Sequence, residues 1–302
     1  NLRQQSYRNY EIVVVDDNSE DATRDIVARH AAEDPRVILV KGKPLPARWN
    51  GKQFACHQGV NRASGKLLLL TDADVRHSPD SIARAVGQLD SGDADFLSGY
   101  VQQEIVTVGE ALVVPMTYIM TTLLLPLKLL TTRFFPSWGF AIGQYMLIRR
   151  EALEAVGGYE ALKDSLVEDM ALSRAVRATG RRTLFVDARE SASCRMYHGY
   201  GDAFRGFAKS IFGAVGGRAL VLLGLIVAIG ALILFPFWQW AGDIAAGGVR
   251  HYPSAVPVLL FLVVWSVALA DRGLPAYLGL AYPIAFAHLV LIGVSSMLRT
   301  GF

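Results

Sequence analysis

The pattern of hydrophobic and polar positions in this 302-residue chain changes near residue 218. Before that point, short apolar runs alternate with charged segments, as in a soluble domain. Beyond it, only five side chains are charged, those of Asp243, Arg250, Asp271, Arg272 and Arg299. Three uncharged stretches there are each near or above the roughly 20 residues that a helix needs to cross a bilayer, namely residues 219–242, 252–270 and 274–298. The pattern predicts a soluble domain over 1–218 and a membrane domain over 219–302 with about three transmembrane helices; a buried helical core is the alternative.

Within residues 1–218 the apolar runs predict alternating strands and helices. Strands are expected near 11–15, 36–40, 66–70, 94–101 and 140–148. Helices are expected near 21–33 and 51–63, after Ser78-Pro79, after Arg149 and after Val167. This order is typical of an α/β fold with a mostly parallel sheet covered on both faces. Ligands of such sheets bind at the carboxyl ends of the strands.

A further uncharged run covers residues 111–127 inside the charged part of the chain. It is short for a transmembrane span and contains Pro115 and Pro126. The run therefore favours an interfacial helix within about 111–130 that lies in the headgroup layer. A helix packed on the sheet is the alternative.

Charge and cysteine content narrow the class of partner and the compartment of this protein. The net charge of +3 is small and no basic stripe is present, which argues against nucleic acid as a partner. Cys56 and Cys194 form no CxxC pair and no disulfide framework, a usage that suits a reducing compartment. Arg205, Lys209 and Arg218 precede the first uncharged stretch. By the positive-inside bias, the soluble domain is expected on the cytoplasmic side.

Paired carboxylates follow two of the predicted strands. Asp72 and Asp74 come directly after the run LLLL and can both reach one cation. Their hard oxygen atoms suit Mg²⁺ or Mn²⁺, which usually share their ligand shell with substrate phosphates. Asp16 and Asp17 follow EIVVV and can accept hydrogen bonds from a nucleobase or ribose. A solvated acidic turn and an Asx turn that caps a helix are the respective alternatives.

Three other residues are candidates for chemistry. Asp169, beside Glu168 at the start of a predicted helix, could act as a general base, or it could simply cap that helix. Lys52 lies in a possible donor-binding loop, Asn50-Gly51-Lys52. Arg195 could hold a diphosphate leaving group, or it could belong to ordinary juxtamembrane enrichment in basic residues.

Several of these motifs occur in an order that points to one family. The segments are VVVDDNSEDAT, GKQFACHQGVNRASGKLLLLTDADV, GQYMLIRREALEAVGGYE and LVEDMALSRAVRATGRR, followed by RMYHGYGDAFRGFAKSIF. Over about residues 9–212 the chain resembles the family 2 glycosyltransferases with a GT-A fold. It is most similar to membrane-bound hopanoid- and carotenoid-associated members, and more distantly similar to ceramide glucosyltransferase.

The resemblance implies an inverting transfer from a nucleotide-diphosphate sugar. Asp16 and Asp17 match the nucleotide-binding DD of the family. Asp72 and Asp74 match the DxD that binds the nucleotide phosphates through Mg²⁺ or Mn²⁺, and Asp169 matches the base of the ED motif. The implied partners are the sugar donor, the membrane and a lipid acceptor, which would be a hopanoid, a carotenoid or another glycolipid precursor. The implied location is a bacterial-type inner (cytoplasmic) membrane, with the catalytic domain facing the cytoplasm.

The chain departs from the family pattern at two places. The family's first strand should precede Asn1, so we expect the natural chain to begin upstream. The Q/RxxRW motif of ceramide glucosyltransferase and the processive synthases is absent, and its nearest match, residues 202–206, keeps only Arg205. A processive polysaccharide synthase is therefore a weaker alternative. A non-catalytic nucleotide-binding membrane protein is another, although such a protein would not need Asp169 as a base.

Overall fold

A computed structural model describes residues 1–124, 139–165, 167–215, 217–247, 252–271 and 273–300. The chain packs into two compact units. The first, called here the α/β unit, consists of Asn1–Gln102 and Leu127–Cys194, and the second, the helical unit, of Gln103–Pro126 and Arg195–Phe302. The sequence division at residue 218 follows charge, whereas this division follows packing. Residues 103–126 and 195–218 accordingly group with the apolar C-terminal helices.

The α/β unit begins with a short 3-10 turn, η1 (Leu2–Gln4), and a β-α-β segment. Strand β1 (Ile12–Asp16), rich in β-branched residues, pairs in parallel with β2 (Val37–Lys41) across helix α1 (Thr23–Glu33). Gly42, just after β2, lies so close to β1 that an added Cβ would be 2.7 Å from the carbonyl oxygen of Asp16. A side chain at position 42 would therefore clash with the backbone at the end of β1.

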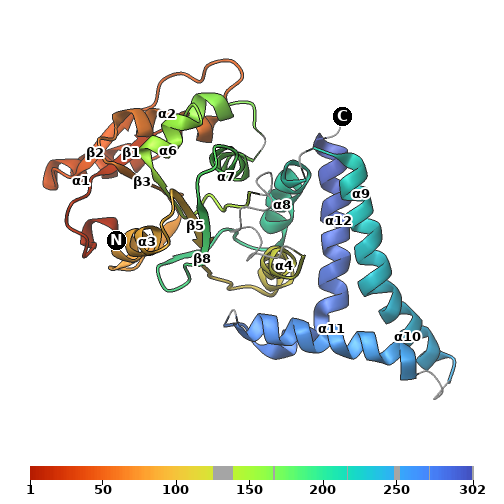
Figure 1. Ribbon diagram of the computed structural model, residues 1–302. Helices are drawn as coiled ribbons and strands as arrows, with labels where there is room; N and C mark the ends of the chain where they lie inside the picture. Colours follow the sequence, from red (N-terminus) through yellow and green to blue (C-terminus); the bar gives the residue numbers. More distant parts are fainter. Residues whose placement is uncertain (125–138, 166, 216, 248–251, 272, 301–302) are drawn as a thin grey trace. The chain divides into compact units, whose positions relative to one another are not determined.

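A four-stranded sheet carries the order β3-β7-β5-β8 (Figure 1). Its strands are β3 (Leu67–Leu70), β5 (Phe96–Tyr100), β7 (Met146–Arg149) and β8 (Thr183–Asp187). Strands β5 and β8 are parallel, but β7 runs antiparallel to both β3 and β5, so the sheets are mixed. Because β7 is antiparallel, its first residue, Met146, lies opposite Leu70 at the end of β3. The segment before β7 is thereby brought to the carboxyl end of β3.

Helices cover both faces of this sheet. The core on one face joins Phe96, Ile148 and Leu172, each fully buried, with side chains of helices on that face. Those helices are α2 (Gly51–Arg62), α6 (Arg150–Ala155), η2 (Tyr159–Leu162) and α7 (Glu168–Ala178). On the other side, α3 (Ser81–Ser91) buries Ser81, Ala85 and Leu89 at a spacing of four residues, which places them on one helix face. The short strands β4 (Val75–His77) and β9 (Ala192–Cys194) pair antiparallel, and β6 (Gln102–Gln103) extends their sheet.

The helical unit contains α4 (Val108–Leu124) and α8 (Tyr200–Ala214), which pack on each other and on the C-terminal helix α12 (Tyr282–Thr300). Residues 111–124 of the predicted interfacial helix fall in α4, whereas residues 125–130 lie outside the described residues. A position in the headgroup layer stays a prediction. The remaining helices are α9 (Ala219–Ile229), the π turn η3 (Gly230–Leu234), α10 (Phe235–Ala245), α11 (Tyr252–Asp271) and η4 (Ala276–Ala281). Pro236 has no N–H to offer the carbonyl four residues earlier, which accounts for the π turn that interrupts this helix.

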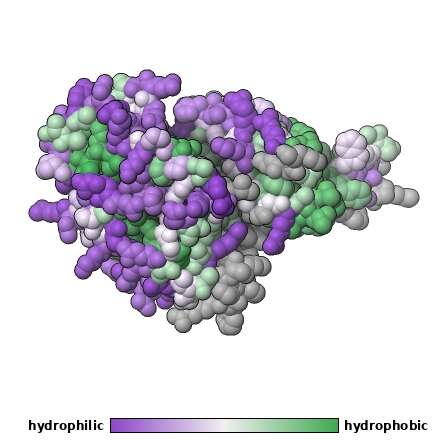
Figure 2. Space-filling model, turned by 90° about the horizontal axis from the view of Figure 1, so that it is seen from above, coloured by the Kyte–Doolittle hydropathy of each residue, from purple (hydrophilic) through white to green (hydrophobic). Residues whose placement is uncertain are grey.

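Among the described residues, two helical segments are long and apolar enough to cross a membrane, Ala219–Ala245 and Ala276–Arg299. Large apolar side chains point outward along the first of them, where Leu220 is 84% exposed and Trp238 is 79% exposed. Figure 2 shows the same apolar surface over the C-terminal helices, in contrast to the mostly hydrophilic face of the α/β unit. Exposed apolar surface of this extent indicates a membrane or partner contact. A third span stays a prediction, because the apolar part of α11 described with its side chains, Ala255–Asp271, is shorter.

Candidate active site

The carboxyl end of β1 holds the predicted pair Asp16 and Asp17. Asp16 is buried, and its Oδ1 accepts a hydrogen bond of 3.1 Å from the Ser19 amide. Hydrogen bonds from the side chain and backbone of Ser19 lower the pKa of Asp16. Asp17 is exposed, and its Oδ2 would lie 3.0 Å from a Cβ placed on Gly51, the first residue of α2. The Asp17 carboxylate therefore approaches the N-terminal end of a helix, where the backbone favours an anion.

Lys52 joins two further carboxylates. Its Nζ lies 2.8 Å from Asp72 Oδ1 and 3.2 Å from Glu168 Oε1. These residues come from the first turn of α2, the turn after β3 and the start of α7, so three elements converge on one ammonium group. Burial lowers the pKa of Lys52, but Asp72 and Glu168 outweigh burial, and the net shift is upward. Lys52 therefore keeps its positive charge at this position.

Asp169 lies beside this group in the first turn of α7. Its Oδ2 accepts a hydrogen bond of 2.8 Å from the Gly143 amide, and its Oδ1 accepts one of 2.7 Å from the Met170 amide. The residue keeps some exposed surface, but protein atoms surround the carboxyl group closely. Burial, reinforced by neighbouring Glu168, raises the pKa of Asp169 to about 6. The carboxyl is therefore a stronger base than an ordinary aspartate.

Gly143 connects Asp169 to Lys52. A Cβ at this position would lie 3.0 Å from Lys52 Nζ and 3.5 Å from Asp169 Oδ2. A side chain would displace the Lys52 ammonium from between its carboxylates. Gly143 and the ion pair of Glu168 could not be predicted from the sequence, because both depend on contacts between segments far apart in the chain. The only local signal was a glycine within the strand expected over 140–148.

The predicted metal ligands lie in the turn that follows β3. The Val75 amide donates to the carbonyl of Asp72 at 3.2 Å, which bends residues 72–75 into a turn. Asp72 is partly buried and Asp74 is exposed. In the part of the chain that the structure describes, no group of three or more His, Cys, Asp or Glu side chains could hold a metal ion. Two carboxylates in one turn nevertheless fit Mg²⁺ or Mn²⁺ if substrate phosphates and water supply the other oxygen ligands.

Arg195 belongs to the helical unit, whereas the other predicted site residues belong to the α/β unit. Its Nη2 donates to Glu110 Oε1 at 2.9 Å. Glu110 is fully buried and also accepts hydrogen bonds of 2.8 Å from the amides of Gly199 and Val106. Burial raises the pKa of Glu110, but these donors outweigh it and bring the pKa to about 2. Glu110 was not among the predicted site residues, because its only signal in the sequence is a charge at the border of an uncharged run.

Replacing Glu110 by Gln should lower the free energy of unfolding by about 1.5–3 kcal/mol, the usual value of hydrogen bonds to a charged group. In the unaltered protein, backbone N–H groups donate to both carboxylate oxygens of Glu110. In the variant one of them would face the amide nitrogen of Gln, which cannot accept a hydrogen bond. Thermal unfolding of the full chain measures the loss, with Lys209→Gln as a control because Lys209 is exposed in the same unit. Equal stability of Glu110→Gln and Lys209→Gln would contradict the structural role of Glu110.

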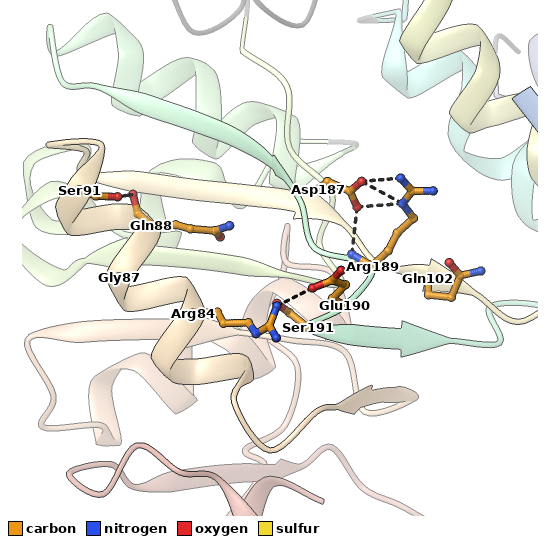
Figure 3. Close-up of a pocket in the computed structure, with 9 residues that line it drawn as sticks. All are labelled: Arg84, Gly87, Gln88, Ser91, Gln102, Asp187, Arg189, Glu190 and Ser191. Atoms are coloured by element: carbon orange, nitrogen blue, oxygen red, sulfur yellow. Dashed lines mark hydrogen bonds and ion pairs between the residues drawn. The ribbon is translucent and has the colours of Figure 1, made fainter. Parts of the chain in front are cut away.

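A groove of about 630 Å³ lies elsewhere in the α/β unit, between α3 and the residues after β8 (Figure 3). None of the predicted site residues lines it. Its arginines already have partners, since Arg84 pairs with Glu190 at 2.7 Å and Arg189 pairs with Asp187 at 2.6 Å. Its charges are thus neutralised within the protein, and we assign it no ligand.

Comparison with known proteins supports an assignment by family. The family described as "Glycosyl transferase family 2" matches residues 1–157. An undecaprenyl-phosphate 4-deoxy-4-formamido-L-arabinose transferase from Edwardsiella ictaluri is 39% identical over 87 residues, which are 28% of this chain and 25% of that protein. A probable glycosyltransferase from Sulfolobus acidocaldarius is 25% identical over 162 residues, or 52% of this chain and 33% of that protein. The chain thus matches about a quarter to a third of the length of these curated relatives.

The fold has a counterpart among solved structures. A mannosyltransferase from Pyrobaculum calidifontis, solved in complex with GDP-Man and Mn²⁺, aligns with a TM-score of 0.53 and 20% identity. The alignment covers 99% of this chain and 82% of that one. The similarity confirms the predicted GT-A-like α/β fold.

Proposed function

The chain belongs to glycosyl transferase family 2, and we propose that it is an inverting enzyme that moves a sugar from a nucleotide-diphosphate donor to a lipid acceptor at a membrane surface. The observation that carries the proposal is the convergence of Lys52, Asp72 and Glu168 beside Asp169. A cation, a candidate metal-binding carboxylate and a carboxyl of raised pKa thus lie together at the carboxyl end of β3.

The donor would be held by groups at the ends of β1 and β3. Asp16 and Asp17 offer acceptors for a base or ribose, and Lys52 offers a positive charge for the diphosphate. Asp72 and Asp74 would hold Mg²⁺ or Mn²⁺, which neutralises charge on a diphosphate leaving group. The Mn²⁺ and GDP-Man of the Pyrobaculum calidifontis structure are consistent with this division of roles. Arg195 is a further candidate for contact with the diphosphate.

Asp169 would act as the base. Each of its carboxylate oxygens accepts one backbone hydrogen bond, which fixes the group and leaves lone pairs for an acceptor proton. As the acceptor oxygen attacks the anomeric carbon, its proton passes to Asp169 and the bond to the diphosphate breaks. A single displacement of this kind inverts the anomeric centre.

The acceptor is proposed to be a lipid. Two apolar helices of membrane-crossing length support this proposal. A base of raised pKa favours a hydroxyl acceptor, which must lose a proton. The name of the Edwardsiella ictaluri relative favours a lipid phosphate instead, which is already ionised and needs no base. The cytoplasmic face of a bacterial-type inner membrane stays the expected location.

The test is to incubate membranes that carry the full-length protein with a panel of labelled nucleotide sugars. The acceptors supplied are a hydroxylated hopanoid, a hydroxylated carotenoid and a polyprenyl phosphate, and the lipid extract is examined by mass spectrometry. A product with one added sugar supports the proposal. A polymer would indicate a processive synthase, and nucleotide binding without product would indicate a non-catalytic binding protein.

The rate of transfer to a hydroxyl acceptor should rise with pH and level off above about 6. The raised pKa of Asp169 means that the carboxyl is protonated, and unable to accept a proton, below that value. The measurement is kcat at saturating donor from pH 4.5 to 8.5, with donor binding followed over the same range. An acidic limb near pH 4, the ordinary value for aspartate, would contradict the role of the buried carboxyl.

In Lys52→Gln the same acidic limb should move to higher pH. The positive charge of Lys52 lowers the pKa of Asp169, so its removal makes the ionised carboxyl less stable. Donor affinity should fall in the same variant, because Lys52 is proposed to contact the diphosphate. A limb that moves to lower pH would contradict this electrostatic coupling.

A further inference from the structure

A buried chain of hydrogen bonds lies beside the Asp72–Asp74 turn and has no place in the chemistry described so far. The imidazole of His77 joins Thr71 to Ser81. His77 Nε2 is 2.9 Å from Thr71 Oγ1, and His77 Nδ1 is 2.9 Å from Ser81 Oγ. His77 is only 5% exposed, and Ser81 is fully buried. A buried imidazole with a partner at each nitrogen is fixed in both position and rotation.

The residues next to this chain of hydrogen bonds define the direction of each bond. Thr71 donates its hydroxyl proton to the Gln144 carbonyl at 3.0 Å, so Thr71 Oγ1 is left to accept from His77 Nε2–H. Tyr145 donates to the Ser81 carbonyl at 2.9 Å, and the Ser81 hydroxyl has two acceptors within reach, Tyr145 Oη at 3.3 Å and His77 Nδ1 at 2.9 Å. Because Nε2 carries the proton of the neutral ring, Nδ1 accepts, and the Ser81 hydroxyl donates to it over the shorter distance. A neutral ring protonated at Nε2 satisfies every member. Burial lowers the pKa of His77 to about 4, in agreement with a neutral ring.

This chain of hydrogen bonds connects the two halves of the proposed active site, the Asp72–Asp74 turn and Asp169. Thr71 directly precedes Asp72, and its partner Gln144 directly follows Gly143. The amide of Gly143 in turn holds Asp169. Beyond Asp74, residues 75–77 form β4, and the His77 ring joins this side of the turn back to Thr71. A shift of the ring would therefore move the carboxylate turn relative to Asp169.

We propose that His77 is a positioning residue, which through Thr71 holds the Asp72–Asp74 turn in register with Gly143 and Asp169. The inference rests on the proposed function, because it assigns the turn to donor and metal binding. Groups that orient metal-binding carboxylates commonly change metal affinity by about 10- to 100-fold when they are removed.

Two substitutions of His77 separate positioning from packing. In His77→Gln the terminal amide nitrogen can occupy the place of Nε2 and donate to Thr71. In His77→Asn the shorter side chain can reach the place of Nδ1 and Ser81, but not Thr71. Both variants lose the aromatic ring, so both should lose stability to a similar extent. Thr71→Val, which keeps the shape and removes the acceptor, should behave as His77→Asn.

The experiment titrates UDP and GDP into the detergent-solubilised full chain, with and without Mn²⁺, by calorimetry. Thermal unfolding of each variant is measured in parallel. We expect His77→Asn and Thr71→Val to weaken Mn²⁺-dependent nucleotide binding by about tenfold or more. His77→Gln should bind nearly as the unaltered protein does. The ¹⁵N shifts of the His77 ring in the unaltered protein should show the proton on Nε2.

Each contrary result has a distinct meaning. Equal binding by His77→Gln and His77→Asn, with Mn²⁺-dependent binding intact in the unaltered protein, would overturn the role of His77 alone. A ring protonated at Nδ1 would overturn it as well, independently of any ligand. Absence of Mn²⁺-dependent nucleotide binding in the unaltered protein would overturn the proposed function together with this role.

Discussion

Replacing Asp169 by Asn is expected to lower kcat for transfer to a hydroxyl acceptor by about 10²- to 10⁴-fold, the usual contribution of a positioned general base. Asn keeps the shape of the side chain but cannot take the acceptor proton. Donor binding should be largely unchanged, because the carboxyl contacts backbone amides and lies beside, not within, the ion pair of Lys52 with Asp72. Single-turnover transfer and calorimetric donor binding measure the two effects separately.

Asp164→Asn is the matched control for this substitution. Asp164 lies five residues earlier and is exposed, and it forms a surface ion pair with Arg48 at 2.6 Å. Such pairs contribute about 0–1 kcal/mol, so activity and stability should stay close to those of the unaltered protein. Full turnover in Asp169→Asn would contradict the assignment of the base. If a polyprenyl phosphate were the acceptor in that experiment, the same result would indicate an already ionised acceptor.

Replacing Asp72 by Asn should weaken metal-dependent donor binding by about 10- to 100-fold or more, since direct ligands matter at least as much as the groups that orient them. The substitution removes a charged oxygen from the proposed metal site. It also removes one of the two carboxylates that hold the Lys52 ammonium, so Lys52 should shift toward Glu168. Donor titration with Mn²⁺ and with a chelator measures the metal-dependent part.

Asp80→Asn is the control for Asp72→Asn. Asp80 is exposed at the N-terminal end of α3, and its side chain makes no capping hydrogen bond. Its substitution should leave donor binding unchanged with and without chelator. Unchanged binding in Asp72→Asn under both conditions would count against the metal site.

The α/β architecture could be predicted because its signals are local. The runs EIVVV and LLLL became β1 and β3, and the helix expected after Ser78-Pro79 became α3. The antiparallel course of β7 could not be predicted, because an apolar run has the same periodicity in either direction. That course decides the site, since it places Gly143 and Gln144 beside the end of β3.

The candidate site likewise has residues that could be predicted from the sequence and contacts that could not. Lys52, Asp72, Asp74 and Asp169 were identified from their residue types and their positions after strands or before helices. Sequence patterns contain no information on which charges meet in space. The ion pair of Lys52 with Glu168, the raised pKa of Asp169 and the bridge through His77 all depend on the packed structure.

By itself the sequence determined the chemistry available to this protein: a chain with an apolar C-terminal part, carboxylates at the ends of two strands and a carboxyl at the start of a helix. These features are local, because hydrophobic periodicity and turn residues act over a few positions. Only the tertiary structure decided which of these groups act together, because burial and proximity determine the pKa of Asp169 and the ion pairs of Lys52. Asp169 has an ordinary side chain in the sequence, and it becomes a base poised near neutral pH only because burial and neighbouring Glu168 raise its pKa further than the Gly143 amide and Lys52 lower it.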